Sequence, residues 1–261
     1  MSNFMRPIRK RLAALLLLFT SYGAAEPVKV KYAEGSLHAF MLLRTQEGKV
    51  IAVGDLDQTV QGAKVTARLS FHFQDGSIRE QTTVFSQRGV FRLLSDHILE
   101  KGPAFKNSVD VWINCPSGQV KVRDMKDGPQ RVTTHHVDIP ADLANGIVPT
   151  LIKNFPDNAK RTLTMVIATP KPRVVKLVVT PERQDLFSVA GQKYTAKEHV
   201  LKVDIGGVAG AVAPVVGKQP PDTYLWIYEG ETPVFVKSLG PLYAEGPIWQ
   251  VELAAPTWGK H

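Results

Sequence analysis

The sequence contains a single cysteine, Cys115. It cannot close an internal disulfide, so the fold depends on its apolar core even in an oxidising compartment. Cys115 follows the apolar run 111–113 and precedes Pro116, at the expected end of a strand. That position favours a small, buried apolar side chain over a reactive thiol.

No stretch carries a catalytic signature. Asp96 and His97 are candidate members of a hydrolytic triad, but the chain has no Gly-x-Ser-x-Gly elbow. Residues 206–210 are glycine-rich and follow an expected strand, yet no Lys-Ser or Lys-Thr pair follows them, which argues against a phosphate loop. We therefore expect a protein without a catalytic site or cofactor, and an envelope hydrolase stays open as an alternative.

Metal-ligating residues are too sparse for a zinc site. His135 and His136 are neighbours on an expected strand, so their side chains point to opposite faces. Only His136 and Asp138 can share a site, and two ligands fall short of the three or four that zinc needs. Asp55 and Asp57 are expected to face solvent. We expect no bound metal.

A leucine-rich apolar run lies near the N-terminus. Four basic residues lie at positions 6–11, the apolar residues 12–19 follow them, and small residues come next at 23–25. This order predicts a signal peptide over residues 1–25, since the run is shorter than the ~20 residues of a membrane span. Because Glu26, and not cysteine, follows, we expect no lipid anchor, and a periplasmic or secreted protein with one β-rich domain over residues 26–261.

Without that leader the formal charge falls from +8 to +4, because the leader holds four basic and no acidic residues. The remaining basic residues are interleaved with acidic ones and form no stripe with exposed aromatics. This pattern argues against a nucleic-acid partner.

The clearest structural pattern is a hairpin. Residues 63–73 alternate strictly between apolar and polar side chains, and the return strand spans residues 77–85. Asp75-Gly76 between them is typical of a type I′ turn. Strands this long are typical of a twisted sheet that curves around a filling.

Further strands are expected on both sides of one helical segment. Apolar residues at helical spacing predict a kinked or broken amphipathic helix over residues 140–155, with Gly146 and Pro149 as interruptions. We expect that helix to lie on the dry face of the sheet, with possible halves 26–139 and 157–261 on either side of it. The strands expected from alternation are 37–43, 49–53, 90–99, 109–113, 120–123, 131–137, 163–167, 174–179, 186–189, 194–205, 223–228, 235–237 and 248–253.

Residues 206–216 form an uncharged stretch without hydrogen-bonding side chains. It is too short to cross a bilayer, so it is either a plug on the core or an apolar flap that gates a cavity or touches lipid. The predicted ligand-binding residues are on this stretch, on the helix and on a later strand: Val208, Val212, Val215, Leu143, Ile147 and Trp226.

Several segments resemble an uncharacterised family of exported bacterial envelope proteins. They are residues 85–89, 140–148, 206–210 with 217–222 and Trp226, 240–243 and 246–249. The resemblance covers most of the mature chain and implies export but no assigned activity. The run of antiparallel strands after a signal peptide is also similar to the half-barrel of lipoprotein-carrier (LolA-like) proteins.

The fold expected from the sequence is therefore all-β, a long-stranded curved antiparallel sheet or half-barrel with one amphipathic helix. Since a curved sheet with a dry concave face needs a filling, we expect a non-enzymatic envelope protein that binds an apolar ligand there, a lipid or acyl chain. Possible partners are a lipid, a lipoprotein or the membrane surface, and the sequence does not fix the oligomeric state. The alternative is a structural or interaction protein of the envelope whose core is filled by its own side chains and whose sheet edges recruit a partner.

Overall fold

The computed structural model of the chain describes residues 27–125, 131–156, 158–167, 171–204, 219–254 and 257–258. Within these ranges the fold is all-β with one short helix, as the alternating pattern predicts. None of the described helical residues forms a segment long and apolar enough to cross a membrane.

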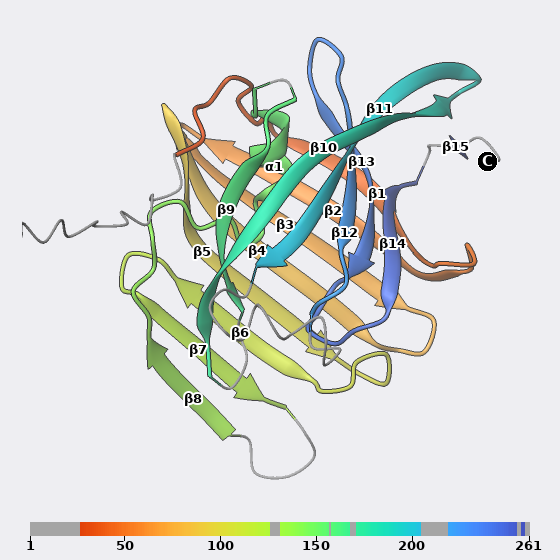
Figure 1. Ribbon diagram of the computed structural model, residues 1–261. Helices are drawn as coiled ribbons and strands as arrows, with labels where there is room; N and C mark the ends of the chain where they lie inside the picture. Colours follow the sequence, from red (N-terminus) through yellow and green to blue (C-terminus); the bar gives the residue numbers. More distant parts are fainter. Residues whose placement is uncertain are drawn as a thin grey trace, which may run out of the picture.

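The first half of the chain is a meander of eight strands (Figure 1). They are β1 (Leu37–Thr45), β2 (Val50–Gln61), β3 (Lys64–Phe73), β4 (Ile78–Arg88), β5 (Val90–Lys101), β6 (Val109–Asn114), β7 (Gln119–Asp124) and β8 (Arg131–His136). The predicted central hairpin is confirmed as β3 and β4. The expected type I′ turn is wrong, because Gly76 has φ +84° but Asp75 does not have a positive φ.

The second half follows the helix α1 (Val148–Lys153). Its strands are β9 (Arg161–Ile167), β10 (Arg173–Val189), β11 (Gln192–Asp204), β12 (Thr223–Tyr228), β13 (Val234–Pro241), β14 (Ile248–Leu253) and β15 (Thr257–Trp258). The predicted segment 206–216 lies outside the described residues.

One antiparallel sheet joins the two halves. Fourteen strands follow the order β15-β10-β11-β12-β13-β14-β1-β2-β3-β4-β5-β6-β7-β8, and β9 pairs with β10 beside that path. The junction is the pairing of β1 with β14, from Met41 opposite Leu253 to Thr45 opposite Trp249. The sheet does not close, because β8 and β9 do not pair with each other in the described chain.

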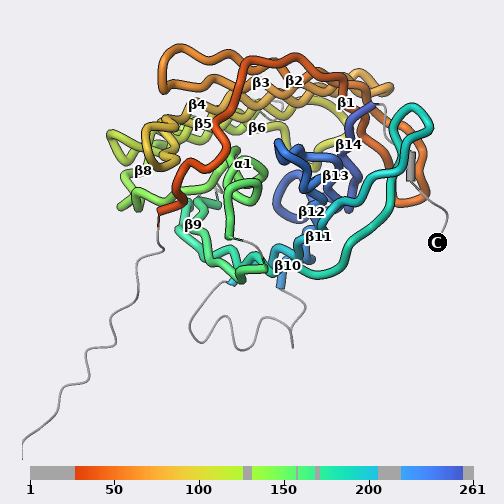
Figure 2. Tube along the Cα trace, turned by 90° about the horizontal axis from the view of Figure 1, so that it is seen from above, coloured from red at the N-terminus to blue at the C-terminus, as the bar shows by residue number. Residues whose placement is uncertain are grey.

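The sheet curves around α1. Seen from above, α1 lies between the layer of β2 to β6 and the layer of β9 to β11 (Figure 2). The main core contains buried side chains from both layers, among them Val65, Phe85, Ile113, Val179 and Ile227. Since α1 and the segment before it contribute further buried side chains to the same cluster, this part of the concave face is filled by the chain itself. These are Leu143, Ala144, Ile147, Leu151 and Ile152, with Phe155 just after the helix.

The predicted helix over residues 140–155 is wrong in its extent, since only six of these residues are helical. Gly146 has φ +71°, which interrupts helical geometry before Val148. The preceding residues pair with the edge of β9 instead. The Ala144 amide donates to the Thr164 carbonyl (2.8 Å), and the Asn145 side chain bonds both backbone groups of Val166 (2.8 Å each).

Two strand predictions also need correction. β2 continues to Gln61, beyond the expected end at residue 53, because Leu56, Gln58 and Val60 keep the alternation through a polar-looking stretch. Residues 174–179 and 186–189 are parts of one strand, β10, rather than two. The pairing with β11 shifts between Pro181 and Gln184, so the proline lies at an irregularity in a continuous strand and not in a turn.

Candidate functional site

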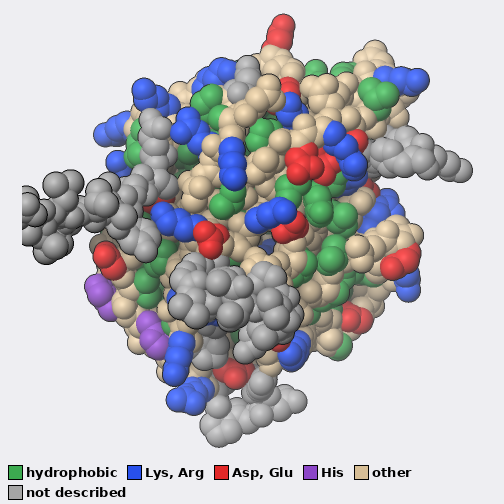
Figure 3. Space-filling view, in the orientation of Figure 1, with side chains coloured by type: hydrophobic (Ala, Val, Ile, Leu, Met, Phe, Trp, Pro, Cys, Tyr) green, Lys and Arg blue, Asp and Glu red, His purple; other side chains and the backbone are tan. Residues whose placement is uncertain are grey.

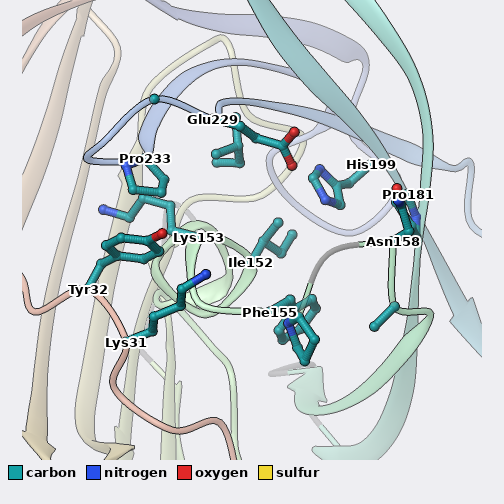
Figure 4. A pocket seen from close by; sticks show the side chains of 14 residues that line it. Lys31, Tyr32, Ile152, Lys153, Phe155, Asn158, Pro181, His199, Glu229 and Pro233 are labelled. Carbon is teal, nitrogen blue, oxygen red and sulfur yellow. The ribbon is translucent and has the colours of Figure 1, made fainter.

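A pocket of about 300 Å³ opens at the mouth of the curved sheet (Figure 4). We call it the mouth pocket. It lies where residues 27–36, which we call the strap, meet the end of α1, the bend of β10 and β11, and the connection from β12 to β13. Its apolar walls are Ile152, Phe155, Pro156, Pro181, Ile227 and Pro233. Its polar side chains are Lys31, Tyr32, Lys153, Asn158, His199 and Glu229.

The strap is anchored to the helix by one buried side chain. Oδ1 of Asn154 accepts hydrogen bonds from the backbone amides of Lys31 (2.8 Å) and Tyr32 (2.6 Å). Nδ2 of Asn154 donates to the Thr150 carbonyl of α1 (2.9 Å). The strap backbone that carries Lys31 and Tyr32 is therefore held at a fixed position on the pocket's rim.

A buried ion pair makes a second anchor. Nζ of Lys153 lies 2.5 Å from Oε1 of Glu34, and both side chains are largely shielded from solvent. Glu34 also exchanges two backbone hydrogen bonds with the Gln87 side chain on β4, at 2.7 and 3.1 Å. The Lys153 charge is thus compensated within the protein, so it helps to hold the strap in place.

His199 is the chemically distinctive group of the pocket. Its side chain is 7 % exposed, and burial lowers its pKa from 6.5 to about 4, so the ring is neutral at physiological pH. Hydrogen bonds of the ring with the backbone of Lys197 and Leu225 oppose this lowering of the pKa, but burial has the larger effect.

Charged groups approach the pocket from opposite sides. The Glu229 carboxylate and the His199 ring face one another on one side, and the Tyr32 hydroxyl and the Lys31 ammonium point in from the other (Figure 4). Asn158 is held at the rim by Nζ of Lys197, which donates to its Oδ1 (2.7 Å). The arrangement suits a molecule with an apolar body and a polar group that both donates and accepts hydrogen bonds.

A second pocket, of about 440 Å³, lies beside the first and shares Phe155 and Pro156 with it. We call it the basic pocket, because the charged side chains that line it are Lys29, Lys160 and Arg161. Both pockets therefore lie against the same turn after α1.

Of the predicted ligand-binding residues, the three that the structure describes line neither pocket. Leu143 and Ile147 are each 2 % exposed within the main core, and neither lines the two pockets. Trp226 belongs to a separate cluster with Phe187 and Val236, and its Nε1 donates to Oδ2 of Asp185 (2.7 Å). Val208, Val212 and Val215 lie outside the described residues.

The structure also shows the neighbours of the histidine and cysteine candidates. His97 is hydrogen-bonded to Asp110 (2.7 Å), not to Asp96, and its ring stacks on Trp112 at 4.6 Å. Burial raises the pKa of the Cys115 thiol to about 11, which suits the predicted packing role.

The structure also places the metal and carboxylate candidates. Within the described ranges no three histidine, cysteine or acidic side chains are grouped as a metal site would require. Asp55 and Asp57 are not an isolated carboxylate pair, because His38 lies between them at 3.4 and 2.6 Å on the outer face.

Sequence reasoning does not single out the strap or Glu229 as site residues. Two signals were present. Val28 and Val30 alternate with Lys29 and Lys31, which indicates a short paired segment with a basic outer side. His199 occupies a position on the otherwise apolar face that includes Leu201 and Val203.

Comparison with known proteins gives no relative to carry an assignment: no family model matches the chain, and no curated protein matches it at a significant level.

Proposed function

We propose that the protein is an exported, non-enzymatic binding protein of the bacterial envelope, whose ligand is a lipid or acyl-chain amphiphile held in the mouth pocket. The observation that carries this proposal is the lining of the mouth pocket, an apolar surface with a few convergent polar side chains and the neutral His199 ring in its wall.

The composition of the pocket supports an amphiphile. Small-molecule sites combine apolar walls with a few convergent polar groups, and typically enclose about 300–1,000 Å³. Here Ile152, Phe155 and Ile227 offer an apolar surface, and Glu229 and Tyr32 offer an acceptor and a donor. The bound group would therefore be oriented by its polar end and stabilised by contact of its chain with these side chains.

Export is supported by the leader-like residues 1–25, which lie outside the described residues, and by the resemblance to exported envelope proteins. A periplasmic or secreted protein would meet lipids, lipoproteins and the membrane surface. Residues 206–216, with Val208, Val212 and Val215, stay a candidate flap against the bound chain.

Native mass spectrometry of protein purified after export, followed by organic extraction, tests the proposal. Ala159 lines the mouth pocket, so Ala159→Trp should fill it, whereas Ala141→Trp places the same ring at an exposed site that lines neither pocket. We expect a co-purifying lipid with wild type and Ala141→Trp and its loss with Ala159→Trp. A bare polypeptide mass that takes up neither envelope lipid nor added lauric acid would overturn the proposal.

A second candidate is a structural or interaction protein, favoured by the way α1 and residues 143–147 fill the concave face. Such a core needs no ligand for stability. The unpaired side of β8 would then offer backbone groups to a partner strand. The Thr134 N–H faces away from β7, whereas the Thr133 N–H faces towards it. Capture of an envelope protein by wild type, lost when Thr134 in β8 is replaced by proline, would favour this candidate over the first.

A further inference from the structure

The basic pocket combines cationic side chains with an apolar floor. Lys29, Lys160 and Arg161 line it, and none of its described lining residues is acidic. Its floor includes Phe155 and Leu163, which are 8 % and 3 % exposed. In the view of Figure 3, Lys and Arg side chains gather at the upper left, where Figure 1 places the strap and the turn between β4 and β5.

The backbone positions of these cations are fixed by different elements. Lys29 pairs with Val90 in an isolated antiparallel bridge, flanked by hydrogen bonds from Val30 to Gly89 and from Phe91 to Val28, each 3.0 Å. Val28 and Val30 pack against the main core, so alternation directs Lys29 to the other side of the strap.

The opposite wall comes from the start of β9, where Arg161 pairs with Val179 of β10. Lys160 immediately precedes it. In the described part of the chain, neither Lys29 nor Lys160 forms an ion pair with a carboxylate. This contrasts with Lys153, whose charge is compensated by Glu34.

We propose that the basic pocket is an anion site that binds the phosphate or carboxylate group of an amphiphilic ligand, with Lys29 and Lys160 as its charge-bearing contacts. Lys29 and Lys160 are exposed residues that line the same pocket, so their positive charges add at its opening and attract an anion. Ammonium and guanidinium donors also form the stronger, charge-assisted hydrogen bonds with phosphate and carboxylate oxygens.

This inference rests on the proposed function only where it concerns the alkyl chain of the ligand. The site for the acidic group is argued from the basic pocket alone. Phe155 and Pro156 line both pockets. An amphiphile can therefore place its acid among Lys29 and Lys160 and its chain against the same Phe155 ring. The ligand class it specifies is an anionic lipid or fatty acid rather than a neutral one.

Isothermal titration calorimetry with three probes tests the site on the whole mature protein. Dodecyl phosphate carries both an alkyl chain and an anion. Dodecyl maltoside carries the same chain on an uncharged sugar, and inorganic phosphate carries the anion without a chain. The test variant is Lys29→Gln with Lys160→Gln. The control, Lys49→Gln with Lys64→Gln, removes the same charge at exposed lysines that line neither pocket.

We expect the test variant to weaken dodecyl phosphate binding about tenfold or more, with the control and dodecyl maltoside unaffected. Equal dodecyl phosphate affinity in wild type and test variant would overturn the anion site while leaving the lipid-binding proposal in place. Phosphate binding that depends on the two lysines, without binding of either dodecyl probe, would keep the site for a free anion and overturn the lipid proposal. No binding of any probe would overturn both.

Discussion

Arg79 and Glu100 place a complete ion pair inside the concave face of the sheet. Nε of Arg79 lies 3.1 Å from Oε1 of Glu100, and the two side chains are 5 % and 4 % exposed. Burial raises the pKa of Glu100, and the neighbouring arginine opposes that rise. In such a pair each partner compensates a charge that is costly to bury alone.

Removing one partner should therefore be worse than removing both. We expect Arg79→Met to lower the free energy of unfolding by about 3–5 kcal/mol, and Arg79→Met with Glu100→Leu to restore much of it. Arg68→Met is the matched control, because Arg68 and Glu80 form an exposed pair (2.9 Å) whose loss should cost less than about 1 kcal/mol. Urea denaturation measures all three. A double variant as unstable as the single one would show that the pair is not the source of the loss.

His199 should make stability depend on pH. Its pKa is 6.5 when unfolded and about 4 when folded, so between these values the unfolded chain binds a proton that the folded chain does not. The contribution of neutral His199 to the free energy of unfolding is therefore fully present above pH 6.5. It falls by about 3 kcal/mol as the pH drops towards 4. Denaturation midpoints of ligand-free protein should lose this dependence in His199→Gln but keep it in His72→Gln, an exposed position on β3. An unchanged pH profile in His199→Gln would contradict the assignment.

Elements with one dry face were predictable, and those fixed by distant contacts were not. β3 was predictable from its strict alternation, and β4 from the turn residues Asp75-Gly76 that precede it. The strap has only a short alternation, and its position depends on Asn154 and Gln87, which are remote in sequence. The helix was overpredicted because residues 140–147 have helical apolar spacing but pair with β9.

Gly146 shows how closely that segment packs. A Cβ there would lie 2.3 Å from Oγ1 of Thr83 and 2.7 Å from Oδ1 of Asp96, and its φ is +71°. Gly62 has a similar φ of +60° but open space around it. We expect Gly62→Ala to cost about 1–2 kcal/mol from backbone strain alone, and Gly146→Ala to cost clearly more because of the added overlap. Thermal denaturation compares the two. Equal losses would mean that Thr83 and Asp96 move aside freely.

The joining of the two halves depends on a pairing that no local pattern reveals. β1 and β14 are separated by most of the chain, yet they are neighbours in the sheet. The mouth pocket likewise assembles from the strap, the end of α1, β10 to β12 and the connection to β13. Alternation predicts which face of a strand is dry, but it does not specify which strand lies beside it, so the curved sheet was predictable and the pocket was not.

A single sheet with a shared core should unfold as one unit. Val179 on β10 is fully buried in the cluster that also contains Phe85 and Ile113 from the other half. Val179→Ala should lower the free energy of unfolding by about 2 kcal/mol, through lost burial and the cavity left behind. In native-state hydrogen exchange, the protection of amides in β4 and β5 should then fall by the same increment as in β10 and β11. Val174→Ala, on the same strand but 40 % exposed, is the control and should change little. A loss confined to β9 to β12 would instead indicate two units that unfold separately, despite the ladder between β1 and β14.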